Sequence, residues 1–334
     1  MNIIDMHCDT LSVLLEKKRN KASYQLRKQD TQIDLEKMKA SGYLLQNFAV
    51  FVDMSDADDP LKEALRTIDL FYDQMEQNAD LIAPVRSFDD IKKNMDNGKM
   101  SALLTLEEGG ICHGEPEFLS ILYRLGARMM TLTWNYENEL GFPNMNMSKV
   151  TCAKDIHTYS LSSEKGLKER GIFFLEEMER LGIIIDVSHL SDAGFYDVLS
   201  HTKKPFVASH SNARGICSAV RNLTDDMIRK LADRGGITGI NFCQDFLGTP
   251  EFGRDYVHQA VRQMKYLIRK GGEDFVALGS DFDGITPYDD MKDCRIMPRL
   301  ADCMKKEGFS QTQIEKIFYK NVLRIYRELL KNAD

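Results

Sequence analysis

Histidine and carboxylate residues in this sequence recur at the ends of short apolar, β-branched segments. The set comprises His7, Asp9, one of the adjacent pair Glu107 and Glu108, His189, His210 and Asp281. Imidazole and carboxylate together suit borderline divalent metals, zinc above all. Even five of these six residues are more protein ligands than a single catalytic zinc usually takes, so the set favours two metals that share a bridging carboxylate.

The first pair, His7 and Asp9, follows the segment that begins the chain. Residues two apart lie on one face of a strand. Ile4, Met6 and Cys8 occupy the other face and suit contact with helices. We therefore expect His7 and Asp9 to face the interior of the sheet structure.

The carboxylates of Glu107 and Glu108 cannot both reach that interior, because neighbouring residues of a strand point to opposite faces. The residues alone leave the choice open. The remaining histidines fall in expected loops or helices, and we interpret them as surface or packing residues. They are His113, His157, His201 and His258.

Eight candidate strands alternate with helix-like segments. The strands are expected at Asn2–Asp9, Leu44–Asp53, Ala102–Gly109, Met129–Asn135, Ile183–His189, Pro205–His210, Ile237–Phe242 and Phe275–Asp281. The helices are expected at Pro60–Gln77, Glu115–Leu125, Glu164–Leu181, Asp192–Leu199, Thr224–Asp233, Tyr256–Lys270 and Gln311–Leu330, with Thr224 and Ser310 at helix starts. Eight strand–helix repeats predict a (β/α)8 TIM-type barrel, whose catalytic residues lie at the carboxyl ends of the strands.

The main alternative is an open doubly wound sheet. The absence of a Gly-x-Gly-x-x-Gly sequence after the first strand weakens it. No linker divides the chain, so we predict one domain over residues 1–334. The loop-rich stretch at about 141–161 is interpreted either as an active-site insertion or as a variable surface loop.

Composition narrows the class of protein. Of the 334 residues, 43% are hydrophobic and 28% are charged, as in a soluble globular protein. The formal net charge is −7, with no basic block, which argues against nucleic-acid binding. No apolar run is long enough to span a membrane. The strand-like start and seven scattered cysteines predict a cytoplasmic protein with reduced thiols.

Several motifs, in order along nearly the whole chain, resemble the membrane (renal) dipeptidase family, peptidase family M19, of the amidohydrolase superfamily. They are His7-Cys8-Asp9, Glu108-Gly109-Gly110, Asp186-Val187-Ser188-His189, Ser209-His210-Ser211-Asn212-Ala213-Arg214, Arg221-Asn222, Gly279-Ser280-Asp281-Phe282-Asp283-Gly284 and Lys320-Asn321-Val322-Leu323-Arg324. The resemblance implies a (β/α)8 barrel that carries two zinc ions, or other divalent ions, and cleaves dipeptides. It also suggests a homodimer.

The resemblance assigns metal ligands residue by residue. His7 and Asp9 would hold the first zinc, and His189 and His210 the second. Glu108 would bridge the two ions, because the Glu-Gly-Gly register selects it over its neighbour.

The resemblance also implies substrate-handling residues. Arg221 would pair with the carboxylate of the dipeptide, and Asp281 would act as the acid/base, with Asp283 as a competitor for that role. Trp134 stands where the animal enzymes have a histidine, as in bacterial relatives, and would wall the substrate pocket.

The predicted function is therefore zinc-dependent hydrolysis of dipeptides, with L,D-dipeptides among the candidate substrates, by a metal-bridged hydroxide. One alternative is another amidohydrolase reaction on the same barrel, either cyclic amide hydrolysis or deamination. A second is a barrel without catalytic activity that binds a peptide or a partner. The intact ligand set argues against this last alternative.

Overall fold

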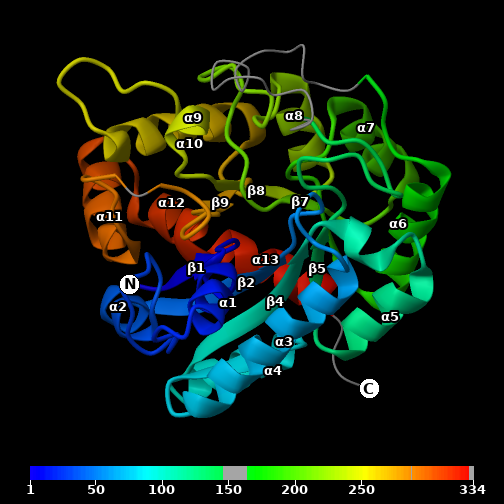
Figure 1. Cartoon of the computed structure of the whole chain (residues 1–334). Coiled ribbons are helices and arrows are strands. Elements are labelled where there is room, and N and C mark those ends of the chain that lie inside the picture. Colours follow the sequence, from blue (N-terminus) through cyan, green and yellow to red (C-terminus); the bar gives the residue numbers. More distant parts are fainter. Residues whose placement is uncertain (146–163, 287, 331–334) are drawn as a thin grey trace.

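A computed structural model describes residues 1–145, 164–286 and 288–330. Its parallel strands close into a barrel (Figure 1), in which β4 pairs with β2 and β9 pairs with β1. The barrel strands are β1 (Ile3–Asp5), β2 (Tyr43–Phe51), β4 (Met100–Glu107), β5 (Met129–Thr131), β6 (Ile184–Asp186), β7 (Val207–Ala208), β8 (Ile237–Ile240) and β9 (Val276–Leu278). Each lies within or overlaps one of the predicted strands, so the eight-stranded barrel is confirmed.

One additional strand was not predicted. β3 (Ile82–Val85) pairs with the first half of β4, and β5 pairs with the last part of β4. The long strand β4 therefore has two successive neighbours on one side. β3 lies outside the ring of barrel strands.

Helices surround the barrel (Figure 1). They are α1 (Thr10–Arg19), α2 (Leu35–Ser41), α3 (Pro60–Gln77), α4 (Phe88–Asp96), α5 (Pro116–Arg124), α6 (Glu169–Leu181), α7 (Asp192–His201), α8 (Asp225–Asp233), α9 (Gln244–Leu247), α10 (Tyr256–Gly271), α11 (Met297–Lys306), α12 (Gln311–Glu315) and α13 (Asn321–Leu329). Short 3-10 segments lie at Gly109–Cys112 (η1) and Cys294–Ile296 (η5), and a π-helical segment at Lys316–Lys320 (η6) joins α12 to α13.

Local signals explain where several helices begin. The Thr224 side chain accepts a hydrogen bond from the Met227 amide, and Ser310 forms a reciprocal capping box with Gln313. Both predicted helix starts are confirmed. Asp59 caps α3, which has proline in its first turn, where the missing N–H costs nothing.

An apolar layer fills the barrel interior near the amino-terminal ends of the strands. Each barrel strand contributes one buried side chain to it, namely Ile4, Leu45, Leu103, Met129, Ile184, Val207, Ile237 and Ala277. Helix α13 adds Ile325 and Tyr326, and the Tyr326 hydroxyl donates to Asn47 Oδ1 at 2.8 Å. This layer closes the amino-terminal end of the barrel, so chemistry is confined to the carboxyl ends of the strands.

The expected orientation of the first strand is wrong in part. Ile4 and Met6 belong to the inner layer, and only Cys8 packs among the helices. The alternation fails because β1 ends at Asp5 and the chain bends at Met6. His7 consequently faces the barrel mouth although Met6 is also turned inward.

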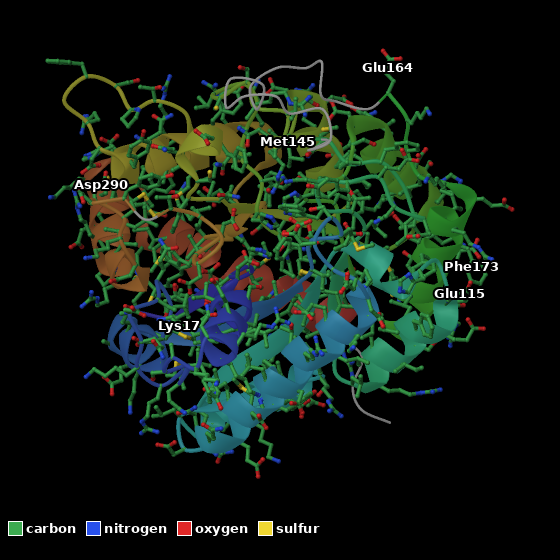
Figure 2. The ribbon with its side chains drawn as sticks, viewed as in Figure 1. Lys17, Glu115, Met145, Glu164, Phe173 and Asp290 are labelled. Atoms are coloured by element: carbon green, nitrogen blue, oxygen red, sulfur yellow. The ribbon has the colours of Figure 1, made fainter. Side chains whose placement is uncertain are left out.

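The outer surface is polar, and side chains project from the ring of helices on all sides (Figure 2). Phe173 on α6, labelled there, is one of few large apolar side chains that are exposed, at 41%. No helix in the described ranges is long and apolar enough to cross a membrane. The six cysteines that these ranges contain are free thiols, in agreement with the prediction.

The predicted insertion at 141–161 lies mostly outside the described residues. Its first part is fixed by isolated bridges, from Gly141 to Leu167 and from Pro143 to Leu190.

Candidate metal centre

Imidazoles and carboxylates from five strand ends converge at the barrel mouth. Three overlapping groups each bring their ligand atoms within 4.8 Å of one another: His7 with Asp9 and Glu107, Glu107 with His189 and His210, and His7 with His210 and Asp281. The structure thus brings together every predicted ligand except Glu108.

Glu107 occupies the centre of this set. Its Oε2 lies 3.1 Å from His7 Nε2, and its Oε1 lies 3.1 Å from His189 Nε2 and 3.6 Å from His210 Nε2. One oxygen therefore faces each half of the site. This is the disposition that a bridging carboxylate needs.

Glu108, the residue predicted to bridge the ions, lies outside these groups, and Glu107 occupies the position between them. Glu108 follows β4 with φ at 112°, which turns its carboxylate away from the mouth. There it accepts hydrogen bonds from the amides of Gly110 and Trp134 and from the Asn138 side chain. Burial raises the pKa of Glu108 to about 7. Glu108 fixes the turn after β4.

His189 and His210 have the protonation that metal binding requires. Burial, followed by the charges of Arg221 and His7, holds the pKa of both rings well below the usual value, so both are neutral. His189 Nδ1 lies 2.8 Å from Asn135 Oδ1, an acceptor, which places the proton on Nδ1. His189 Nε2 therefore carries a lone pair, and it lies 2.9 Å from His210 Nε2.

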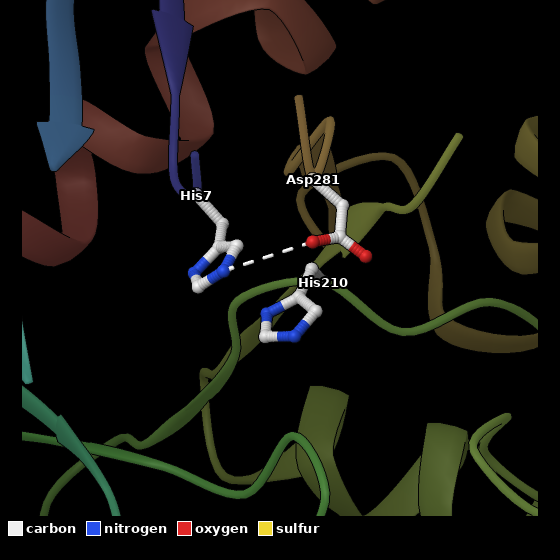
Figure 3. A group of neighbouring side chains, drawn as sticks. All are labelled: His7, His210 and Asp281. Carbon is white, nitrogen blue, oxygen red and sulfur yellow. Dashed lines mark ion pairs between the residues drawn. The ribbon is translucent and has the colours of Figure 1, made fainter. Parts of the chain in front are cut away.

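The other half of the site contains His7, Asp9 and Asp281. Figure 3 shows Asp281 beside His7 and above His210, and the two imidazole rings stack at 3.9 Å between centroids. Asp281 Oδ1 lies 3.8 Å from His7 Nε2, and Asp281 Oδ2 accepts from Asn241 Nδ2 at 2.8 Å.

These atoms fit divalent cations. Among the described residues, buried His7 Nε2 and Asp9 Oδ1 have no hydrogen-bond partner. Burial lowers the pKa of His7, but the charges of Glu107 and Asp9 outweigh it and raise that pKa well above the usual value. Burial and Glu107 raise the pKa of Asp9. A site whose carboxylates need a proton is short of positive charge, which metal ions would supply.

Two buried aspartates clamp neighbouring strand ends beneath the site. Asp5 accepts from the Ser280 amide at 2.8 Å, from the Ser280 hydroxyl at 2.6 Å and from the His7 amide at 3.3 Å. This arrangement links the end of β1 to the residue before Asp281. Asp5 did not stand out in the sequence as a functional residue, and neither did Asp186, the second of these two aspartates.

Asp186 repeats this arrangement on the other side of the barrel. It accepts from the Ser209 amide at 2.9 Å, from the Ser209 hydroxyl and from the Ser188 amide at 2.9 Å. The Ser209 hydroxyl lies 2.7 Å from His210 Nδ1, so this clamp also touches a candidate ligand ring.

Left-handed backbone conformations cluster at the mouth. Glu108, His189, Asp281 and Asp283 all have φ between 65° and 112°. Non-glycine residues adopt this region at a cost that the surrounding structure must overcome, and such residues gather at functional sites.

Arg221 lies in the same end of the barrel. Its side chain is buried, and its Nη atoms donate to Ser211 Oγ at 3.4 Å and to the His210 carbonyl at 3.3 Å. Within the described ranges no carboxylate forms an ion pair with it, and its Nε has no partner. Burial lowers its pKa. A buried guanidinium without a counter-ion can receive an anion.

Trp134 lies beside the candidate ligands. Its ring meets Phe51 edge-on at 4.8 Å between centroids and lies 6.2 Å from the His189 ring. Asp283 was predicted to compete with Asp281 for the acid/base role. Its carboxylate instead accepts hydrogen bonds from Thr10 Oγ1 and from the Gln32 amide, both at 2.6 Å.

The histidines assigned to the surface or to packing lie apart from the centre where they are described. His113 and His201 are exposed, and His258 pairs with Asp255 at 2.6 Å. His157 lies outside the described residues.

Comparison with known proteins gives a consistent result. The family model described as "Membrane dipeptidase (Peptidase family M19)" matches residues 1–334. An uncharacterized dipeptidase of Schizosaccharomyces pombe is 32% identical over 98% of this chain and 80% of its own length.

Two solved structures share the whole fold. A metallopeptidase of Rhodobacter sphaeroides, liganded with a phosphinate mimic of the dipeptide L-Ala-D-Ala, is 25% identical with a TM-score of 0.86, over 98% of this chain and 99% of that one. Dipeptidase AC, a metallopeptidase of family M19, is 26% identical with a TM-score of 0.86, over 99% of each chain. The family model covers the whole chain and the solved relatives share its barrel: the chain belongs to the membrane dipeptidase family, peptidase family M19, and is a hydrolase of this metallopeptidase class.

Proposed function

We propose that the protein hydrolyses dipeptides with two divalent ions, zinc in the first instance, bound at the barrel mouth. His7, Asp9 and Glu107 would hold one ion, and Glu107, His189 and His210 the other. The observation that carries this proposal is the Glu107 carboxylate, which presents one oxygen to each half of the site at 3.1 Å. Two ions held by a shared carboxylate would supply a nucleophile from water at neutral pH and a Lewis acid for the peptide carbonyl.

Asp281 is the residue best placed to move a proton. Asn241 holds one of its oxygens, and the other points toward His7. Burial raises the pKa of Asp281 to about 6, which brings its two protonation states close in free energy near neutrality. Asp281 would accept a proton from the attacking water and return it to the leaving amine.

Arg221 would bind the carboxylate of the dipeptide. A guanidinium offers a planar pair of donors that matches a carboxylate. Because Arg221 is buried near the centre, a substrate that extends beyond its carboxylate would not fit, which limits substrates to dipeptides. Trp134 would wall the opposite part of the pocket.

A dipeptide with a D-residue in second position is part of this proposal. Support comes from the Rhodobacter sphaeroides structure, which binds a mimic of L-Ala-D-Ala. Hydrolysis of L,L- and L,D-dipeptides should be measured side by side.

The adjacent glutamates offer a matched test. Glu107→Gln removes the charge shared by both halves of the site, so we expect fewer than two ions per chain by elemental analysis and loss of dipeptide hydrolysis. Glu108→Gln places an amide among the donors of Gly110, Trp134 and Asn138. It should lower thermal stability while keeping two ions and activity.

Two results would contradict the proposal. One is full metal content in Glu107→Gln together with loss of metal in Glu108→Gln. The other is a wild-type protein that cleaves cyclic amides or deaminates amino-substituted rings and leaves dipeptides intact, which would support a different amidohydrolase reaction.

A further inference from the structure

A cavity of about 340 Å³ opens at the carboxyl end of β2, between helices α1 and α3. Phe51, Val52 and Asp53 form its wall on the β2 side, and Ser12, Leu15 and Arg19 form the α1 side. The volume is in the range of small-ligand pockets. None of the candidate metal ligands lines it, so it is a separate space beside the centre.

Phe51 connects this cavity to the candidate metal centre. It is the register partner of Glu107 in the paired strands β2 and β4, and paired residues of neighbouring strands point to the same face. The Phe51 ring also meets Trp134, which in turn neighbours His189. One aromatic side chain thus lies between the cavity and the bridging carboxylate.

The strand order places the cavity opposite Arg221. Around the closed barrel β2 is followed by β4, β5, β6 and β7, so β2 and β7 are four positions apart and face each other across the axis. Arg221 lies in the segment after β7. A dipeptide whose carboxylate is held by Arg221 and whose peptide bond lies over the centre would direct its amino-terminal residue toward β2.

The charges in the cavity are unbalanced. Five acidic and three basic side chains line it, and two of the basic ones, Arg19 and Arg66, both contact Glu63. Among the described residues, no cation pairs with the carboxylates of Asp53, Asp56 or Asp58. The cavity therefore has an excess of negative charge on the wall that continues from β2.

Asp53 is oriented to receive a ligand. Its Oδ1 accepts hydrogen bonds from the amide and the hydroxyl of Ser55, at 2.8 and 2.7 Å, and no described residue forms a hydrogen bond with its Oδ2. The Ser12 hydroxyl, on the α1 side, is buried and has no hydrogen-bond partner among the described residues. An ammonium or guanidinium group could donate to both kinds of oxygen.

We propose that this cavity is the subsite for the amino-terminal residue of the dipeptide and that it selects a cationic side chain, that of lysine or arginine. The inference depends on the proposed dipeptidase function and on the placement of the substrate carboxylate at Arg221. Phe51 and Leu15 would contact the methylene stem of the side chain, and Asp53 would accept from its charged end.

The test compares dipeptides that differ only in the charge of the first side chain. Lys-Ala, norleucyl-Ala and Glu-Ala should be hydrolysed with kcat/KM in that order, with Lys-Ala at least about tenfold above norleucyl-Ala, as expected for a hydrogen bond between charged groups. Asp53→Asn should reduce this ratio about fivefold or more, chiefly through a lower kcat/KM for Lys-Ala. Asp302→Asn, which removes one charge from exposed α11, is the matched control and should not alter the ratio.

A second variant tests whether the charge at position 53 sets the substrate preference directly. Asp53→Lys should invert the order, so that Glu-Ala becomes preferred over Lys-Ala. Equal kcat/KM for Lys-Ala and norleucyl-Ala in the wild type, or an unchanged ratio in Asp53→Asn, would overturn the subsite assignment while leaving the dipeptidase function intact. Failure to cleave any of the three dipeptides, or L,D pairs, would overturn the proposed function and with it this inference.

Discussion

His7 is the one candidate ligand whose ring is held in the protonated state. The carboxylates of Glu107 and Asp9 outweigh burial and raise its pKa well above the usual value, whereas the pKa values of His189 and His210 are lowered. A metal ion must displace the His7 proton in order to bind at Nε2. Protons and metal ions therefore compete for the same nitrogen.

This competition predicts how metal affinity depends on pH. Because the proton binds more tightly to His7 than to a free imidazole, metal affinity should rise from pH 6 to pH 8. Binding should also release protons, which calorimetry in buffers of different ionisation enthalpy would measure. A proton count of zero, with the same affinity at both pH values, would contradict the raised pKa.

Asp281 could be either a proton-transfer group or a metal ligand, because it lies within reach of His7 and His210. Asp281→Asn retains an oxygen and removes the base. If Asp281 moves the proton, kcat should fall by about 10²- to 10⁴-fold with both ions retained. Elemental analysis beside the kinetics decides between the roles, since loss of one ion would make Asp281 a ligand. Asp283→Asn is the control, and it should affect stability more than kcat.

At the scale of elements, the two aspartate clamps join strand ends that carry different halves of the site. Asp186 fixes Ser209, which contacts His210, and Asp5 fixes Ser280, next to Asp281. Asp186→Asn should weaken the ion at His189 and His210 by about 10- to 100-fold, the usual effect of losing an outer-shell partner. Asp5→Asn should instead weaken the ion at His7.

Competition with a chelator, followed for each variant at a fixed total metal concentration, would separate the two affinities. Circular dichroism must show that each variant is folded. Equal loss at both sites in both variants would mean that the clamps stabilise the barrel as a whole and do not position separate halves.

The strands could be predicted because each barrel strand has a distinct apolar pattern and ends in polar residues. The short strand β3 escaped prediction because Pro84 lies within it and because its sequence, Ile82–Val85, is only four residues long. Proline is usual only in edge or irregular strands. β3 is such a strand, since it pairs with β4 alone.

The residues that gather at the barrel mouth could be predicted except for Glu107. Leu103 lies in the inner layer, and Thr105 and Glu107 follow it at intervals of two, so strand alternation alone favours Glu107. The prediction instead followed the Glu-Gly-Gly motif of the family, which indicated Glu108. The roles of Asp5 and Asp186 could not be predicted, because each depends on a serine in a neighbouring strand that only the fold brings close.

At the scale of the whole molecule, the inner layer and α13 stabilise the barrel from the end opposite to the site. Tyr326 is buried and its hydroxyl donates to Asn47 Oδ1. Tyr326→Phe leaves that acceptor without its partner, so the free energy of unfolding should fall by about 1–3 kcal/mol. Urea titration would measure this loss.

Kinetic constants should remain unchanged in Tyr326→Phe, because the tyrosine belongs to the apolar layer and its hydroxyl contacts Asn47, which is not a candidate metal ligand. Tyr24→Phe, which removes a partly exposed hydroxyl, is the matched control and should change stability by less than about 0.5 kcal/mol. A fall in kcat with stability unchanged would contradict this division between the two ends of the barrel.

The closure of the barrel by β9 against β1 has a consequence for synthesis of the protein. β1 and His7 are synthesised before β9, Asp281 and helix α13, and about 270 residues separate His7 from Asp281. Until then β1 lacks one neighbour, and its unpaired backbone groups are open to incorrect association. The nascent chain therefore needs protection from the synthesis of β1 until that of β9, and the barrel that positions the ligand set can close only then.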